Sequence, residues 1–270
     1  YFTIRIFKYL LSIYFMKKNI YVPLMFLLLT FISCEIVDTK INPFYSDVVG
    51  KLRDAIEYEI KDKNLNAISI AIIKKDDFFW SEGFGFIDEE KKIKADENTI
   101  YRVGSVSKLF TDIAIMKKRE SGDIDIDSPI QIYLPKFNPE NKFNNEPITL
   151  RQLMSHRAGI LREPAYGNYF ADNETSLKKT VESVKNSSLI HPPGTITKYS
   201  NAGIAVVGYT LEKVFQKPYV EFMQQNILNP LGMNASSFEF KNSMSLNLAE
   251  ATMWSYDGRS FKAPRFELGM

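Results

Sequence analysis

Strand-type and helix-type patterns occupy separate parts of this chain, and that separation limits its fold class more than any other feature. Residues 67–73 (AISIAII) and 78–86 (FFWSEGFGF) are rich in β-branched and aromatic residues and flank a polar KKDD turn, which predicts a β-hairpin. Apolar residues instead recur at helical spacing over 105–120, 149–157 and 202–216. An early hairpin followed by several helices predicts an α+β fold.

Two of the expected helices have a predicted buried face. A helix should precede the hairpin and cover one face of its sheet, because apolar residues recur every four positions at Val48, Leu52, Ile56 and Ile60. The 105–120 helix should end at Gly122. Its expected apolar side consists of Val106, Leu109, Phe110, Ile113 and Met116.

Two further helices have predicted ends. Thr149 and Gln152 have the spacing of a capping box, and Gly159 is placed as the stop of that helix. The 202–216 helix should end before Pro218, because proline cannot continue a helix.

The N-terminal segment has the pattern of an export signal. Met16, a plausible start of translation, is followed by two lysines and an apolar run that ends at Ser33, so residues 1–33 are predicted to be a leader. Cys34 directly after a small residue resembles the bacterial lipoprotein signal, in which that cysteine is acylated. An uncleaved membrane helix over 9–33 is the alternative. Either interpretation places a 34–43 tether and a 44–270 domain outside the cytoplasm, attached to a membrane.

Charge and cysteine content exclude several classes of partner. The leader holds four of the 34 basic residues and none of the 32 acidic ones, so the rest of the chain has 30 bases against 32 acids, a formal charge of −2. That balance gives no reason to expect nucleic acid as a partner. A single cysteine allows no internal disulfide, and the two histidines have no HExxH spacing. We expect neither a metal site nor another cofactor.

The segment YRVGSVSKLFT places Ser105 and Lys108 three positions apart where a helical pattern begins. This spacing puts both side chains on one face of a helix, and a helix N-terminus favours negative charge. A lysine whose charge is suppressed can accept a serine proton, so Ser105 is a candidate nucleophile. Ser176 and Lys179 have the same spacing but lie in a polar helical stretch, which favours a solvated surface.

A second segment, ITKYSNAGIAVVG, places Tyr199 and Asn201 at the start of another helix. The tyrosine can relay a proton, and the asparagine amide can hold a substrate carbonyl or orient the lysine. A packed ring and a helix cap would be the purely structural interpretation. The similar Tyr166-Gly167-Asn168 has no apolar helix after it.

Four blocks in order resemble the family of class C β-lactamases, D,D-peptidases and esterases. They are YRVGSVSKLFT, ITLRQLMSHRAGI, KYSNAGIAVVGYTLE and NILNPLGM, and the resemblance covers about residues 45–240. It implies an antiparallel sheet flanked by helices with a helical lobe. It also implies Ser105 as the acylated residue, Lys108 as its partner, Tyr199 as proton relay and Asn201 as a substrate contact. His156 is expected to be architectural.

The resemblance also implies a third motif, a Lys/His-x-Gly strand, which does not occur before Met270. We therefore expect the C-terminal strands of the fold to be missing from this chain.

The leading hypothesis is a serine hydrolase acting on a peptide amide of D-amino-acid type, a β-lactam or an ester, with a small-molecule or peptidoglycan-like substrate. The alternatives are a non-catalytic wall-binding or sensor lipoprotein, and an inactive fragment of such an enzyme.

Overall fold

The computed structural model describes residues 45–263 except 76, 89, 91, 144–145 and 169–175. The predicted leader with Met16, the acylated Cys34 and the 34–43 tether lie outside the described residues. The described residues divide into two compact units, one that contains 45–58 and 70–82 and one that contains 59–69 and 83–263. Helix α3 (Ser46–Asp62) and strands β1 (Ala67–Lys74) and β2 (Asp77–Asp88) each contribute to both units.

In the first unit, α3 contributes Val49 and β2 contributes Trp80, both fully buried. Arg53 on α3 donates to Glu82 on β2 at 2.7 Å, and Trp80 donates its indole N–H to the same carboxylate at 3.0 Å. The predicted helix and hairpin are therefore present. The prediction that Val48 lies on the buried face of α3 was wrong, because this residue is 50% exposed. Steps of four residues drift around a helix by about 40° each, so Val49 faces inward at this end instead.

A short third strand completes the sheet that the hairpin begins. The strand order is β1-β2-β3, and β3 (Ile93–Lys94) runs antiparallel to β2 with a register irregularity between Phe86 and Asp88. At Gly85 φ is +75°, and a Cβ there would lie 2.2 Å from the carbonyl oxygen of Asn66, so only glycine fits. The backbone N–H of Phe86 donates to that oxygen.

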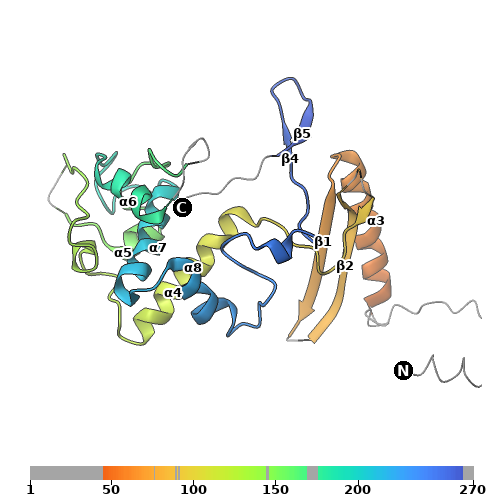
Figure 1. Cartoon of the computed structure of the whole chain (residues 1–270), viewed down its shortest axis with the longest axis horizontal. Helices are drawn as coiled ribbons and strands as arrows, with labels where there is room; N and C mark the ends of the chain where they lie inside the picture. Colours follow the sequence, from red (N-terminus) through yellow and green to blue (C-terminus); the bar gives the residue numbers. More distant parts are fainter. Residues whose placement is uncertain are drawn as a thin grey trace, which may run out of the picture. The chain divides into compact units, whose positions relative to one another are not determined.

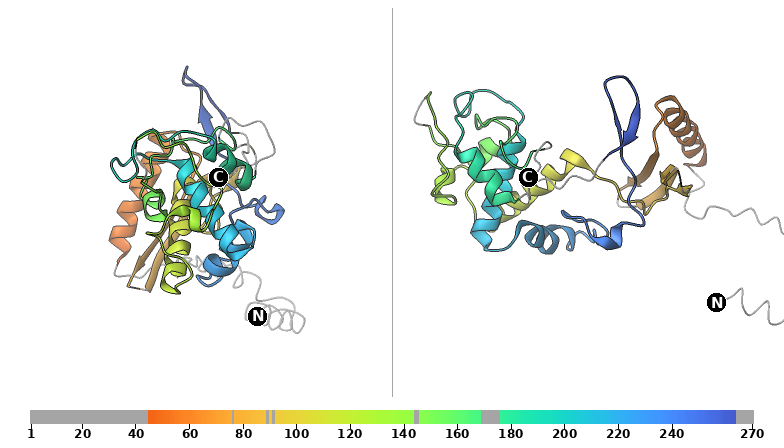
Figure 2. Two further views of the ribbon diagram at one scale, coloured as in Figure 1. Left: turned by 90° about the vertical axis from the view of Figure 1, so that its left-hand side faces the viewer. Right: turned by 45° about the horizontal axis from the view of Figure 1, so that its top comes forward.

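The core of the second unit is helical, and α7 (Asn201–Phe215) is its central element (Figure 1). This helix contacts α4 (Ser107–Glu120), α5 (Leu150–Met154), α6 (Leu177–Lys185) and α8 (Tyr219–Met223), and Figure 2 gives two further views of the group. Residues 201–208 of α7 are all buried. A helix that is apolar on every side must be covered on every side.

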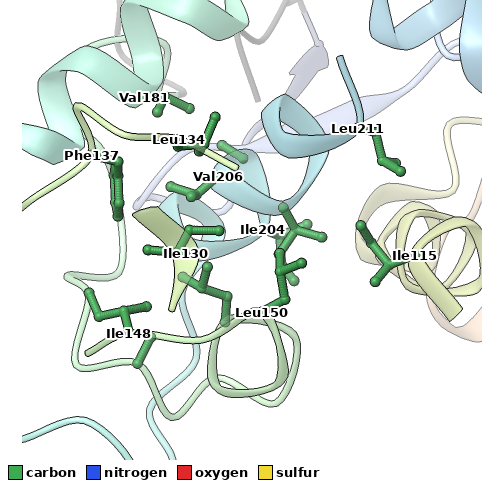
Figure 3. Close-up of a cluster of buried hydrophobic side chains, with 14 of the residues drawn as sticks. Ile115, Ile130, Leu134, Phe137, Ile148, Leu150, Val181, Ile204, Val206 and Leu211 are labelled. Carbon is green, nitrogen blue, oxygen red and sulfur yellow. The ribbon is translucent and has the colours of Figure 1, made fainter. Parts of the chain in front are cut away.

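Side chains from widely separated segments meet on α7. Figure 3 shows Val206 and Ile204 of α7 close to Ile130, Leu134 and Leu150. Because α7 is held from several sides, its first turn is a fixed platform for the residues just before it.

Helix α4 begins and ends near the predicted positions but buries a different face. Thr111, Ala114 and Ile115 are buried. The expected apolar side is largely exposed, by 36–58% at Val106, Leu109, Ile113 and Met116. Apolar residues of α4 itself occupy most of its circumference, so their spacing does not determine which face is buried. The hydroxyl of Thr111, 2.7 Å from that of Tyr219 in α8, marks the buried side.

The helix ends follow the predicted chemistry only in part. The Thr149–Gln152 capping box is confirmed by both of its hydrogen bonds. The predicted stop at Gly159 was wrong, because α5 already ends at Met154 and His156 takes the left-handed conformation, with φ +59°. Gly159 serves another contact, since a Cβ there would lie 2.2 Å from the carbonyl oxygen of His191. Helix α7 ends before Pro218 as expected.

A hairpin near the end of the described chain was not predicted, although the Asp257-Gly258 pair in its loop is a turn signal. Its strands β4 (Thr252–Trp254) and β5 (Ser260–Lys262) pair antiparallel. The two small sheets, the antiparallel pairing of β2 with β3 and of β4 with β5, and the separate group of helices confirm the expected α+β class. Within the described part of the chain, no helix has the length and apolar character needed to cross a bilayer.

Candidate active site

Ser105 lies in a single 3₁₀ turn, Gly104–Val106, that leads directly into α4. Gly104 has φ +52°, a left-handed conformation that glycine adopts readily, and no atom lies within 4 Å of a Cβ built there. The glycine therefore serves the backbone bend rather than a close contact. Ser105 is exposed and lies two residues before the start of α4, a 14-residue helix.

Lys108 is in the first turn of α4, and its Nζ donates to Ser105 Oγ at 3.3 Å. The three-residue spacing thus brings the two side chains together as predicted.

Tyr199 completes a cluster with these two residues, although it is 94 positions from Ser105. Its Oη lies 2.7 Å from Ser105 Oγ. The next residue, Ser200, caps α7 by accepting from the N–H of Gly203 at 2.8 Å, and it donates to the carbonyl of Leu161 at 2.6 Å. The cap fixes the backbone at the start of α7, directly after Tyr199. Ser200 therefore has the capping role that a purely structural interpretation gave to Asn201.

Two positively charged side chains lie close to the ring of Tyr199. Lys108 Nζ lies 5.2 Å from the ring centroid, and the guanidinium carbon of Arg162 lies 5.3 Å from it. Burial raises the pKa of Tyr199, but the bonds to Lys108 and Ser105 and the charges of Lys108 and Arg162 together outweigh burial. The pKa of Tyr199 is therefore below its ordinary value, which favours the phenolate.

His156 supports the tyrosine from another side. The two rings are 4.6 Å apart at their centroids and tilted by 40°, and His156 Nδ1 accepts from the N–H of Ser200 at 3.3 Å. Burial, followed by the charge of Lys108, lowers the pKa of His156. A neutral imidazole that accepts a backbone N–H has an architectural contact, as the sequence predicted.

Asn201 is buried in the first turn of α7 and has a different partner from the other three site residues. Its Nδ2 donates to Glu163 Oε1 at 2.8 Å. The same carboxylate oxygen lies 3.3 Å from Nε of Arg162. Ser105, Lys108 and Tyr199 are thus brought together by direct hydrogen bonds, and Asn201 is linked to them through Glu163 and Arg162.

Arg162 and Glu163 were missed by the sequence analysis. They directly follow the SHRAGIL segment and precede Pro164. The signal that could have found them is an adjacent pair of opposite charges next to a block already assigned to the site.

The two look-alike motifs have structural roles. Ser176 is the N-cap of α6, where its Oγ accepts from the N–H of Lys179 at 3.3 Å. Asn168 donates from Nδ2 to the carbonyl of Pro164 at 2.9 Å, within its own loop. Among the described residues, no group of three or more histidine, cysteine or acidic side chains is arranged to hold a metal ion.

Comparisons with known proteins match most of the chain. The family model described as Beta-lactamase matches residues 52–269. The chain is 27% identical to Protein flp of Staphylococcus aureus over 200 residues, which is 74% of this chain and 40% of that protein. It is 30% identical to Beta-lactamase-like protein 2 of Dictyostelium discoideum over 263 residues, 93% of this chain and 48% of that protein.

A solved structure is similar over the same region. The octameric penicillin-binding protein homologue from Pyrococcus abyssi superposes with a TM-score of 0.70 at 31% identity, over 80% of this chain and 50% of that one. The chain therefore belongs to the beta-lactamase family, whose members are generally serine hydrolases. It spans less than half the length of the two curated relatives.

Proposed function

We propose that this protein is a serine hydrolase that forms an acyl-enzyme on Ser105. The substrate is a peptide amide of D-amino-acid type, a β-lactam or a carboxylic ester, either a small molecule or a peptidoglycan-like chain. The observation that carries this proposal is the 2.7 Å separation of Tyr199 Oη and Ser105 Oγ, with Lys108 Nζ 3.3 Å from the same oxygen. Without a proton acceptor at this distance, a serine hydroxyl is a weak nucleophile.

In the proposed first step, Ser105 Oγ attacks the substrate carbonyl carbon while its proton passes to Tyr199 Oη. The carbonyl π electrons move to the oxygen, and the start of α4 favours the negative charge that forms there. When the tetrahedral intermediate collapses, the bond to the leaving amine or alkoxide breaks and that group takes the proton. Water then hydrolyses the ester on Ser105 by the same sequence of proton transfers.

Tyr199 is the proposed base because it is the closer of the two neighbours of Ser105 and because its pKa is lowered. The positive charge of Lys108 stabilises the phenolate and orients the serine oxygen. His156 has no such role in the proposal, because its Nδ1 accepts the Ser200 N–H.

We further propose that the protein is exported and held at a membrane surface by lipid on Cys34. The basis is the apolar run that ends in Ser33 and the single cysteine of the chain. A substrate in the cell wall would then lie within reach of the site.

The experiment that tests the hydrolase proposal is labelling with a fluorophosphonate probe. The wild type should be labelled and Ser105→Ala should not. Ser176→Ala is the matched control, because Ser176 has the same spacing to a lysine but caps a helix, and it should label like the wild type. Labelling that persists in Ser105→Ala would contradict the assignment. Absence of labelling in wild type, both with the fluorophosphonate and with a penicillin probe, would favour the wall-binding or sensor alternative.

A further inference from the structure

Arg162 lies beside the reacting residues with most of its guanidinium unused. Its Nε donates to Glu163 Oε1 at 3.3 Å, and its guanidinium carbon lies 5.3 Å from the centroid of the Tyr199 ring. Within the described part of the chain, Nη1 and Nη2 make no hydrogen bond or ion pair, and the side chain is 67% exposed. A guanidinium carries its N–H donors in a planar fork, so those on Nη1 and Nη2 remain open to a ligand.

Several contacts anchor Arg162. Its backbone carbonyl accepts from the N–H groups of Asn201 and Ala202, at 2.8 and 3.2 Å, which ties the residue to the first turn of α7. Glu163 Oε1 also accepts from Asn201 Nδ2 at 2.8 Å, so the carboxylate that meets Arg162 Nε is itself fixed. An arginine that served only solvation would need no such anchor. The open edge of the fork is therefore preorganised, which reduces the entropy lost when a ligand binds.

The charges and the shape of this edge favour a carboxylate. Lys108 and Arg162 both lie close to Tyr199, and among the described residues Glu163 is the single carboxylate within 4 Å of either cation. Two parallel N–H groups on a rigid fork match the two oxygens of a carboxylate, and the charges make such bonds stronger than neutral ones. A carboxylate is thus the ligand that the open edge fits best.

The proposed proton transfer indicates which half of the substrate reaches Arg162. Tyr199 Oη returns the proton to the leaving group, so the leaving group must lie against this oxygen, 2.7 Å from Ser105 Oγ. Arg162 lies instead over the face of the ring and is joined to the first turn of α7. The half of the substrate left to meet Arg162 is the acyl half.

We propose that Arg162 is a specificity residue that binds a carboxylate on the acyl half of the substrate, a few bonds from the scissile carbonyl. This inference rests on the proposed function and names the substrate class of its site, which is acyl groups that carry a negative charge. It separates them from neutral esters and from substrates whose only charge is on the leaving group.

The test compares two esters, mono-p-nitrophenyl adipate and p-nitrophenyl adipamate, each corrected for spontaneous hydrolysis. The second has a neutral amide where the first has a carboxylate. Wild type should favour the first by about tenfold or more in kcat/KM, the value of a hydrogen bond between charged groups. In Arg162→Gln the preference should fall to within about twofold, and Arg162→Lys, which keeps the charge without the fork, should be intermediate. Arg119→Gln, exposed in the last turn of α4, is the matched control and should keep the wild-type preference.

The ratio of the two rates isolates the contact, because the loss of a charge near Tyr199 slows both esters alike. No preference in wild type, or the same preference in Arg162→Gln, would overturn the inference. A second pair, meta-carboxyphenyl acetate and meta-carbamoylphenyl acetate, carries the same groups on the leaving half. Arg162→Gln should change the rates of these two acetates by equal factors. An effect of Arg162 confined to this second pair would overturn the assignment to the acyl half.

A pH profile gives a readout that a merely structural role would not move. A carboxylate bound to Arg162 neutralises one of the charges that lower the pKa of Tyr199. With mono-p-nitrophenyl adipate, the rising limb of kcat, which reports the enzyme–substrate complex, should therefore lie at higher pH than the limb of kcat/KM, which reports the free enzyme. With the adipamate the two limbs should coincide. Coincident limbs for both esters would overturn the inference.

A binding measurement separates this inference from the hydrolase proposal. In ¹⁵N NMR spectra of Ser105→Ala, which cannot form the acyl-enzyme, the Arg162 Nε–H signal is identified by its loss in the double variant with Arg162→Lys. Monomethyl adipate should shift this signal and methyl adipamate should not. No shift with either ester would overturn the inference. A shift with the anionic ester, without any fluorophosphonate label on Ser105 of wild type, would leave the carboxylate site standing and refute the proposed hydrolase.

Discussion

The phenol oxygen of Tyr199 lies 2.7 Å from the hydroxyl oxygen of Ser105, and the two residues reach this distance from the starts of two different helices. Helix α7 is buried in the helical core of its unit, and its cap, Ser200, is bonded to both Gly203 and Leu161. The short distance thus depends on the packing of α7 and on the Ser200 cap directly after Tyr199. The proposed proton transfer depends on this pair.

Removing either proton partner of Ser105 should lower the rate of the chemical step. We expect Lys108→Ala and Tyr199→Phe each to reduce kcat by roughly 10²–10⁴, the usual range for general acid–base catalysis. The double variant should be little slower than the worse single variant, because the two groups act on one proton. Steady-state kinetics with a chromogenic ester measures this. Near-wild-type rates in both single variants would show that the proton goes elsewhere.

The pH dependence should follow the phenolate of Tyr199. If this group is the base, its deprotonated form is the active one, so kcat/KM should rise with pH through the pKa of Tyr199 in the free enzyme. That pKa lies below the usual value because the bonds to Lys108 and Ser105 and the neighbouring charges outweigh burial. Arg162→Gln removes one of these charges and should move the rising limb to higher pH. Lys178→Gln, on exposed α6, should leave the limb in place, and an unmoved limb in Arg162→Gln would contradict the assignment.

Asp112 on α4 should destabilise the fold at neutral pH. Burial raises its pKa to about 6, and its Oδ1 has no hydrogen-bond partner within the described part of the chain. The folded state holds the proton of Asp112 more tightly than the unfolded state does, so the protonated carboxyl adds to the free energy of unfolding. This contribution is fully present below pH 3.8 and is lost as the pH rises through about 6.

Asp112→Asn should therefore raise the free energy of unfolding at pH 8 by about 1–2 kcal/mol, less than the full pKa shift would give because solvent screens the half-buried carboxylate, and leave it nearly unchanged at pH 4. Urea denaturation at the two pH values measures the difference. Asp54→Asn, exposed on α3, is the control. A gain of equal size at both pH values would mean that the carboxyl charge is not its cause.

The membrane attachment should depend on Cys34. Metabolic labelling with a clickable fatty acid in a bacterial host should label wild type and not Cys34→Ala, and the variant should be released or keep its leader. A single acyl chain, at about 0.8 kcal/mol per buried CH₂, holds a protein only marginally, so stable retention also requires a second chain. Equal membrane retention without label in wild type would favour the uncleaved helix.

The sequence predicted the parts of the structure that depend on short-range chemistry. The Ser105–Lys108 contact follows from helical spacing, and the Thr149–Gln152 capping box from its own pattern. The buried face of α4 did not follow, because apolar residues occur on most of its circumference and the neighbours that cover Ala114 and Ile115 are far away in sequence.

Long-range partners explain the other errors. No local pattern links Asn201 to Glu163, 38 positions before it, and none indicates that the non-glycine His156, ahead of Gly159, already adopts the left-handed conformation after α5. The hairpin of β4 and β5 was missed for a different reason: its three-residue strands are too short to show an alternation of apolar residues, and the Asp257-Gly258 turn signal in its loop was not used.

The most direct test of the account is the mass of a trapped acyl-enzyme. A chromogenic ester should release one equivalent of leaving group in a burst, and quenched protein should gain the mass of one acyl group. Fragmentation of the tryptic peptide 103–108 should place that group on Ser105 and not on Ser107, the other serine of the peptide. Ser107→Ala should keep the adduct and Ser105→Ala should lose both adduct and burst. An adduct on another residue, or full turnover in Ser105→Ala, would contradict the account.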